Sequence, residues 1–181
     1  MTVLLKPIPD NLVLQSERLT LRRFTSEDVE VFFRINSEPD LVQYTTRAAL
    51  TSLDEAATTL ESTHFRADES VGLGRFACVE KSTGLVVGIA GLRPAPEHDS
   101  FAFGYRILPE YWGRGFATEA ATTLLQYGYG MLQLDKIVAT VFPKNLASQR
   151  VLEKLGLVFE KEVILADSPQ ILWLYQPPAS A

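Results

Sequence analysis

The stretch Leu108–Ala120, LPEYWGRGFATEA, joins the end of an apolar segment to the start of a helical pattern, with two glycines flanking an arginine between them. The preceding residues, Ser100–Leu108, have the composition of a strand, and Pro109 ends it because proline cannot donate to a sheet ladder. Gly113 and Gly115 lack Cβ atoms, so backbone amides can approach a ligand closely at this turn. The stretch therefore predicts a strand–turn–helix unit whose turn leaves the backbone accessible.

The backbone amides from Gly113 to Thr118 are expected to point outward at the N-terminus of this helix. Such an N-terminus attracts an anion, most naturally a pyrophosphate here, and Arg114 would add a positive charge. The alternative is a flexible strand-to-helix turn that binds nothing. The segment is not a Walker A loop, since no Gly-Lys-Ser/Thr follows. It is not a Gly-x-Gly-x-x-Gly dinucleotide loop either, since Thr118 occupies the place of the third glycine.

The length and composition of the chain are those of one globular domain, residues 1–181. Of the 181 residues, 46% are hydrophobic and 22% are charged, which is enough apolar material for a sizeable core. The net charge of −5 gives no overall attraction to nucleic acid or to an anionic membrane, and weakly favours cationic substrates. No apolar run reaches the roughly 20 residues of a membrane span, and no signal-peptide core is present, so cytoplasmic residence is expected.

The chain has one cysteine, Cys78, and two histidines, His64 and His98, which lie far apart in the sequence. A single cysteine excludes an intramolecular disulfide and leaves no cysteine cluster for zinc, so we expect no metal site. Cys78 alternates with apolar neighbours on a predicted strand, and a packed position away from any chemistry is expected for it.

Hydrophobic periodicity predicts a mixed α/β domain, with helices early, strands in the middle and a strand–helix–strand–helix–strand unit in the second half. Ser26 and Ser52 are predicted to cap the first two helices, and Gly156 to end the last one. A crossover would join the strand 100–108 to the strand 135–142. The predicted strands are 18–24, 75–81, 85–92, 100–108, 135–142, 157–165 and 171–176. The predicted helices are 25–36, 52–67, 117–132 and 145–156.

Several segments together resemble the GNAT N-acetyltransferase superfamily. WGRGFATEA resembles its acyl-coenzyme A pyrophosphate loop, Gln/Arg-x-x-Gly-x-Gly/Ala, with Trp112 in the first place, Gly115 in the fourth and Ala117 in the sixth. SERLTLRRFTSEDVEVFFRINSEPDLVQY resembles the opening strand and helix of the branch that includes the ribosomal-protein N-terminal acetyltransferases. KSTGLVVGIAGL is similar to the hairpin of that branch, and KIVATVFPKNLASQRVLEKLGLVFE to its fifth strand and following helix. The resemblance covers residues 16–162.

The resemblance implies a GNAT-like acyl-CoA N-acyltransferase fold, in which helices flank a twisted, mostly antiparallel sheet with one splayed pair of parallel strands. It also implies acetyl-coenzyme A as co-substrate, with no metal. The pantetheine arm would follow the strand that ends at Ile107 and Leu108, and a backbone N–H near Ile107 would polarise the thioester carbonyl. Asn145 would contact the same arm, although its place at a helix start also suits an N-cap. The residues implied to hold the pyrophosphate are Gly113, Arg114, Gly115, Phe116, Ala117 and Thr118.

Two catalytic groups that are common in the superfamily are missing at their expected places. Leu152 replaces a helix tyrosine, so the resemblance assigns protonation of the leaving thiolate to Ser148, one turn earlier on the same face. The alternative for Ser148 is a helix-surface hydroxyl that bonds to its own backbone. No carboxylate lies just before the Gly-Tyr step that ends at Tyr105, where several relatives carry a glutamate as base. Glu110 and Glu119 lie nearby, but a solvated turn and a first helical turn explain them equally well, so the amine would lose its proton to water or arrive neutral.

The sequence thus predicts an acetyl-coenzyme A-dependent N-acetyltransferase that transfers an acetyl group directly to a primary amine, on a protein N-terminus or a small molecule. A non-catalytic acyl-coenzyme A-binding module stays open because of the missing groups, and a nucleotide-phosphate binder ranks last because no magnesium-ligand motif is present. We expect no nucleic-acid or membrane partner, and a monomer or homodimer. The side chains that either line an acceptor pocket or pack in the core are Tyr44, Tyr105, Trp173, Tyr175 and His98.

Overall fold

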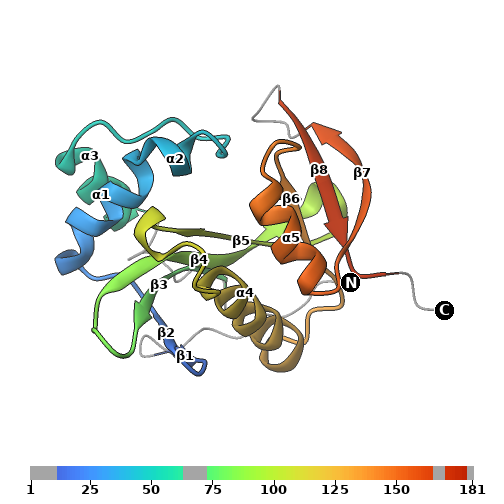
Figure 1. Ribbon diagram of the computed structural model, residues 1–181, viewed down its shortest axis with the longest axis horizontal. Coiled ribbons are helices and arrows are strands. Elements are labelled where there is room, and N and C mark those ends of the chain that lie inside the picture. The colour runs from blue at the N-terminus through green and yellow to red at the C-terminus, as the bar shows by residue number, and fades with distance from the viewer. Residues whose placement is uncertain (1–11, 63–72, 165–169, 179–181) are drawn as a thin grey trace.

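The computed structural model describes residues 12–62, 73–164 and 170–178, and shows a sheet with helices on both faces (Figure 1). The described strands follow the order β1-β2-β3-β4-β5-β6-β8-β7. Neighbouring strands are antiparallel except for β5 and β6, which are parallel. The predicted fold class is therefore confirmed. The strands are β1 (Val13–Gln15), β2 (Leu19–Arg22), β3 (Gly74–Glu80), β4 (Val86–Ala95), β5 (Ser100–Ile107), β6 (Ile137–Val141), β7 (Val158–Ile164) and β8 (Ile171–Gln176).

The helices divide between the two faces of the sheet, and Figure 1 shows α1, α2 and α3 grouped apart from α4 and α5. Phe116 and Leu124 of α4 pack in one core cluster with Phe76 of β3. Ala77, the next residue of β3, packs in a second cluster with Phe32 of α1, because successive side chains of a strand point to opposite faces. The helices are α1 (Val29–Ser37), α2 (Pro39–Val42), α3 (Leu53–Leu60), α4 (Phe116–Gln126) and α5 (Leu146–Lys154). The short helical turns are η1 (Ser26–Asp28), η3 (Pro96–His98), η4 (Pro109–Tyr111) and η5 (Tyr127–Met131).

Helix starts follow the capping chemistry of the sequence, with one correction. The Ser52 hydroxyl accepts the Glu55 N–H at 3.1 Å, which confirms the predicted cap of α3. Ser26 is not the first N-cap, because Thr25 holds that place and forms a capping box with Asp28, whose carboxylate accepts the Thr25 N–H at 2.8 Å. The short elements β1 and α2 were not predicted, since neither is long enough to show a periodic pattern.

A partly buried ion pair joins β2 to η1, the helical turn that precedes α1. Arg22 donates from Nη1 and Nη2 to the two carboxylate oxygens of Asp28 at 2.6 and 2.9 Å, and the Asp28 side chain is only 7% exposed. Burial by itself raises the pKa of Asp28, but hydrogen bonds from Arg22 and Thr25 outweigh it and hold the pKa below its usual value. The pair therefore stabilises the folded chain through the ionised carboxylate.

Replacing Asp28 with asparagine is expected to lower the free energy of unfolding by ~2 kcal/mol, somewhat less than for a fully buried pair because Arg22 is partly exposed. The pKa of Asp28 is lower in the folded chain, so this contribution is present above the unfolded pKa of about 3.9 and is lost as the pH falls through the folded pKa. Urea unfolding of both proteins at pH 7 and near pH 2.5 measures it. An equally large difference at both pH values would contradict the ion-pair explanation.

Candidate functional site

A cleft of about 1140 Å³ opens where β5 and β6 separate. These two strands pair only at Phe101 with Ile137 and at Ala102 with Val138, while β8 pairs with the opposite edge of β6. The splayed parallel pair implied by the resemblance is therefore present. The segments that contribute to the cleft are 40–48, 89–93, 102–107, 111–113, 115–118, 139–142, 144–148 and 150–152, together with Asn36, Arg75, Glu97, Lys154 and Leu172.

The edge of β5 presents backbone donors to this opening. The Phe101 N–H donates to the Lys136 carbonyl beside β6 at 3.2 Å, whereas the Leu108 N–H donates to Val87 of β4 at 2.9 Å. Because N–H groups alternate sides along a strand, those of Tyr105 and Ile107 point toward the β6 side, beyond the last parallel pair. The backbone position predicted to polarise a carbonyl, Ile107, thus faces the cleft.

The turn before α4 holds two glycines in the left-handed region, with φ of +73° at Gly113 and +85° at Gly115. The first intrahelical bond runs from the Glu119 N–H to the Gly115 carbonyl at 3.1 Å. The amides of Phe116, Ala117 and Thr118 precede it, and none has an acceptor within the described chain. All three residues line the cleft, so the local geometry fits a bound anion such as a pyrophosphate.

Two residues of the predicted cofactor site point elsewhere. The Arg114 guanidinium donates to the Glu80 carboxylate and lies 4.8 Å from the centre of the Phe116 ring, and Arg114 is absent from the lining of the cleft. Leu108 is 1% exposed, and its N–H is already bonded to Val87. Any contact between Arg114 and a bound anion would therefore have to come from its backbone.

The loop is held from outside by Arg18. Its Nη1 donates to the Arg114 carbonyl at 2.9 Å and its Nε to the Glu119 carboxylate at 2.8 Å, while its guanidinium lies 4.7 Å from the centre of the Phe116 ring. Burial raises the pKa of Glu119, but hydrogen bonds from Ser16 and Arg18 hold it below its usual value. Glu119 therefore acts as an anchor of the loop.

No carboxylate stands where a base was sought. Glu110 forms an exposed ion pair with Arg34 at 2.7 Å and, like Glu119, is absent from the lining of the cleft. Among the described residues that line the cleft, the carboxylates are Asp40 and Glu97, and Glu97 is bonded to Arg93 at 3.2 Å.

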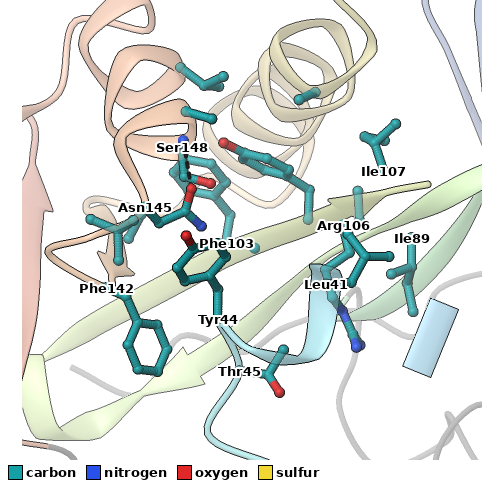
Figure 2. A pocket seen from close by; sticks show the side chains of 18 of the residues that line it. Leu41, Tyr44, Thr45, Ile89, Phe103, Arg106, Ile107, Phe142, Asn145 and Ser148 are labelled. Atoms are coloured by element: carbon teal, nitrogen blue, oxygen red, sulfur yellow. Dashed lines mark hydrogen bonds between the residues drawn. The ribbon is translucent and has the colours of Figure 1, made fainter. Parts of the chain in front are cut away.

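The start of α5 brings Asn145 and Ser148 together at the cleft, as Figure 2 shows. The Asn145 carboxamide oxygen accepts the Ser148 N–H at 3.1 Å, so its N-cap role is confirmed. The amide nitrogen of the same side chain has no partner within the described chain and can donate to a ligand. Leu152, one turn after Ser148, is buried and cannot supply a proton.

Tyr105 brings a second hydroxyl to the same place. Its hydroxyl oxygen is buried and has no well-formed hydrogen bond among the described residues. Burial raises the pKa of Tyr105 to about 12, while the approach of the Ser148 hydroxyl, within hydrogen-bonding range, lowers it. The two hydroxyls thus lie side by side in the wall of the cleft and keep hydrogen-bonding capacity for a ligand.

Of the other side chains predicted to line an acceptor pocket or pack in the core, Tyr44 lines the cleft and the rest do not. Tyr44 lines the cleft, and its ring centre lies 6.3 Å from that of Phe142, so the segment after α2 reaches the end of β6 (Figure 2). Trp173, Tyr175 and His98 are absent from the lining. Trp173 instead donates to Glu162 at 3.3 Å, and Tyr175 is 3% exposed. His64 lies outside the described residues.

The remaining sequence-based expectations concern Cys78, metals and membranes. Cys78 is fully buried, and burial raises the pKa of its thiol, which confirms a packed position. Within ranges 12–62, 73–164 and 170–178, no group of three or more His, Cys, Asp or Glu side chains is placed to hold a metal ion. In the same part of the chain, no helix has the length and apolar character needed to cross a bilayer.

Sequence reasoning missed three arginines that line the cleft: Arg47, Arg75 and Arg106. The sequence pattern could have indicated two of these three arginines. Arg75 and Arg106 interrupt otherwise apolar strands, at positions whose neighbours two residues away, Ala77 and Leu108, are buried in the second core cluster. A cation on the covered face of a strand is uncommon without a partner.

Comparisons with known proteins agree with this geometry. Residues 18–158 match the family model described as an acetyltransferase (GNAT) domain. The uncharacterized N-acetyltransferase YoaA of Bacillus subtilis is 32% identical over 84% of this chain and 85% of its own length. A spermidine N(1)-acetyltransferase of Vibrio cholerae is 25% identical over 82% and 84% of the two chains.

Solved structures support the fold. A GNAT-family acetyltransferase from Bacillus anthracis superposes with a TM-score of 0.78 at 23% identity, covering 91% of this chain and 97% of its own. A putative ribosomal-protein-serine acetyltransferase from Vibrio cholerae gives a TM-score of 0.77 at 21% identity, covering 93% and 98%. The family model matches residues 18–158, which is most of the chain, so this protein belongs to the GNAT acetyltransferase family.

Proposed function

We propose that this chain transfers the acetyl group of acetyl-coenzyme A to a primary amine, by direct attack within a ternary complex. The observation that supports this most is the continuity of free backbone donors along one cleft. They run from the start of α4 to the unpaired edge of β5. When bound, acetyl-coenzyme A supplies the acetyl group as a thioester.

The backbone would hold and polarise the thioester. The amides of Phe116, Ala117 and Thr118 would bind the pyrophosphate, and the edge of β5 would bind the pantetheine arm. The Ile107 N–H would donate to the thioester carbonyl, where negative charge develops during attack by the amine. The free amide nitrogen of Asn145 would steady the same arm.

Side-chain hydroxyls would protonate the departing thiolate. Ser148 lines the cleft and is held at the first turn of α5 by the Asn145 cap, and Tyr105 lies beside it. The amine would lose its proton to water, since Glu110 and Glu119 are both engaged in ion pairs.

The names of related proteins support a primary amine as the acceptor. The names of two relatives refer to spermidine and to the serine of a ribosomal protein, so both a small amine and a protein N-terminus fit the proposal. A more specific form of the proposal places this chain in the branch of ribosomal-protein N-terminal acetyltransferases. In that form the protein is a cytoplasmic monomer or homodimer.

A thiol-release screen tests the proposal. Acetyl-coenzyme A is offered with panels of peptides, polyamines, amino acids and aminoglycosides, and free thiol is followed against an amine-free control. We expect release well above the control with at least one panel. Calorimetric binding of acetyl-coenzyme A without any amine-dependent release would instead favour a non-catalytic binding module. Tight ATP binding with no preference for coenzyme A would favour a nucleotide binder.

A further inference from the structure

Three arginines from distant parts of the sequence converge on the face of the sheet that lies opposite α4. The register pairs Ala77 with Ile89 and Ile89 with Arg106, so these residues share a face, and Arg75 lies two places before Ala77 on the same strand. Arg47, from the segment after α2, lines the same cleft. Figure 2 shows Arg106 reaching away from Ser148, to the side where Leu41 and Thr45 lie.

Open space lies over Gly104, two places before Arg106 on the same face of β5. A Cβ placed on Gly104 would meet nothing within 4 Å, whereas a Cβ on Gly91, its partner in register, would collide with the backbone of Gly74 and Arg75. The row across β4 and β5 therefore leaves room on the Gly104 side, next to Arg106.

The positive charges are not balanced by the described protein. Arg106 donates to the neutral Asn36 side chain at 2.9 Å, and no ion pair joins Arg47, Arg75 or Arg106 to a carboxylate of the described chain. Burial, followed by repulsion from Arg47 and Arg93, lowers the pKa of Arg75 to about 10. Burial, followed by repulsion from Arg75 and Arg47, lowers that of Arg106 to about 9. Arg75 and Arg106 stay charged at neutral pH, and the repulsion that acts on them makes the region attractive to an anion.

We propose that Arg47, Arg75 and Arg106 bind the anionic group of the acceptor, which is a small primary amine that carries a carboxylate or a phosphate. This inference rests on the proposed acetyl transfer and narrows its substrate class. Guanidinium groups bind such planar or tetrahedral anions through paired hydrogen bonds. A small acceptor is favoured because a cleft of about 1140 Å³ must hold both the thioester arm and the amine. A polyamine would meet like charges here.

Matched substrates test the charge requirement. Thiol release is compared for leucine against leucinamide and for glucosamine 6-phosphate against glucosamine, with spermidine and an acidic hexapeptide as further arms. We expect kcat/KM to be at least tenfold higher for the anionic member of one pair. A preference for leucine would identify the anionic group as a carboxylate, and a preference for glucosamine 6-phosphate would identify it as a phosphate. Preference for the neutral members or for spermidine would overturn the inference, and acetylation of the peptide alone would overturn the small-molecule class. Release by other amines of the wider screen with silence in both anionic arms would overturn this inference alone, whereas silence in these arms and across the wider screen, with acetyl-coenzyme A bound, would refute the proposed function itself.

Variants locate the anion site. Arg75→Gln is expected to lower kcat/KM for the preferred anionic amine at least 30-fold, mainly through KM, with unchanged acetyl-coenzyme A affinity. Arg75→Lys should recover part of the loss and controls for misfolding. Arg34→Gln is the matched control, because Arg34 is paired with Glu110 and is absent from the lining of the cleft, and a change below threefold is expected. Equal losses for Arg75→Gln and Arg34→Gln, or equal losses for anionic and neutral amines, would contradict the proposal.

Discussion

Gly115→Val is expected to weaken acetyl-coenzyme A binding at least tenfold, as measured by titration calorimetry. With φ at +85°, Gly115 occupies a region that a β-branched residue adopts only with ~1–2 kcal/mol or more of strain. A Cβ there would also lie 3.3 Å from Nη2 of Arg18, the residue that anchors the loop. The turn would have to shift, and with it the amides of Phe116, Ala117 and Thr118. A tenfold loss corresponds to ~1.4 kcal/mol, which misdirecting these donors readily accounts for.

Gly156→Val is the matched control for this change. Gly156 follows α5 with φ of +80°, and a Cβ there would meet nothing within 4 Å, so valine introduces similar strain outside the lining of the cleft. Both variants should lose stability, but only Gly115→Val should lose cofactor affinity. Wild-type affinity in a folded Gly115→Val protein would refute the assignment of this turn as the pyrophosphate loop.

Local chemistry explains why this turn was predictable from sequence. The requirement for glycine at residues 113 and 115 is a property of consecutive backbone angles, and the start of α4 follows within one residue. The cap of α3 by Ser52 and the break after α5 at Gly156 are similarly local. The first helix start shows the limit of local prediction, because the N-cap is Thr25 and not the predicted Ser26. The two adjacent hydroxyl residues are equally plausible caps, and the capping box with Asp28 favours Thr25.

The charge of the cleft was not predictable from composition. The whole chain carries −5, yet the described residues lining the cleft include five arginines and two lysines against two carboxylates. Arg47, Arg75 and Arg106 approach one another only through strand register and the path of the chain after α2. The ion pairs that occupy Glu110 and Glu119 also link segments more than 70 residues apart in the sequence. Net charge therefore did not reveal that the lining of this cleft carries more cations than carboxylates.

The buried hydroxyl of Tyr105 could not be anticipated either, since its lack of a well-formed hydrogen bond depends on where β5 leaves β6. Sequence reasoning placed Ser148 as the only proton donor. The structure sets Tyr105 beside it, with a pKa of about 12 that keeps the phenol protonated at neutral pH. Tyr105 can therefore donate to the thiolate directly or hand a proton on to Ser148.

Ser148→Ala is expected to lower kcat about 100-fold, the usual scale for losing a general acid, while the dissociation constant of acetyl-coenzyme A stays within threefold of wild type. If Ser148 and Tyr105 form one relay, Tyr105→Phe should cost a similar factor, and the double variant should be no slower than the slower single variant, because groups that act as a unit are not additive. Multiplicative losses would instead indicate independent roles.

Ser37→Ala is the matched control, since that hydroxyl bonds to the Phe33 carbonyl of its own helix, and normal turnover is expected. Normal turnover in Ser148→Ala would remove Ser148 from proton transfer, and a loss confined to Tyr105→Phe would transfer the role to the tyrosine.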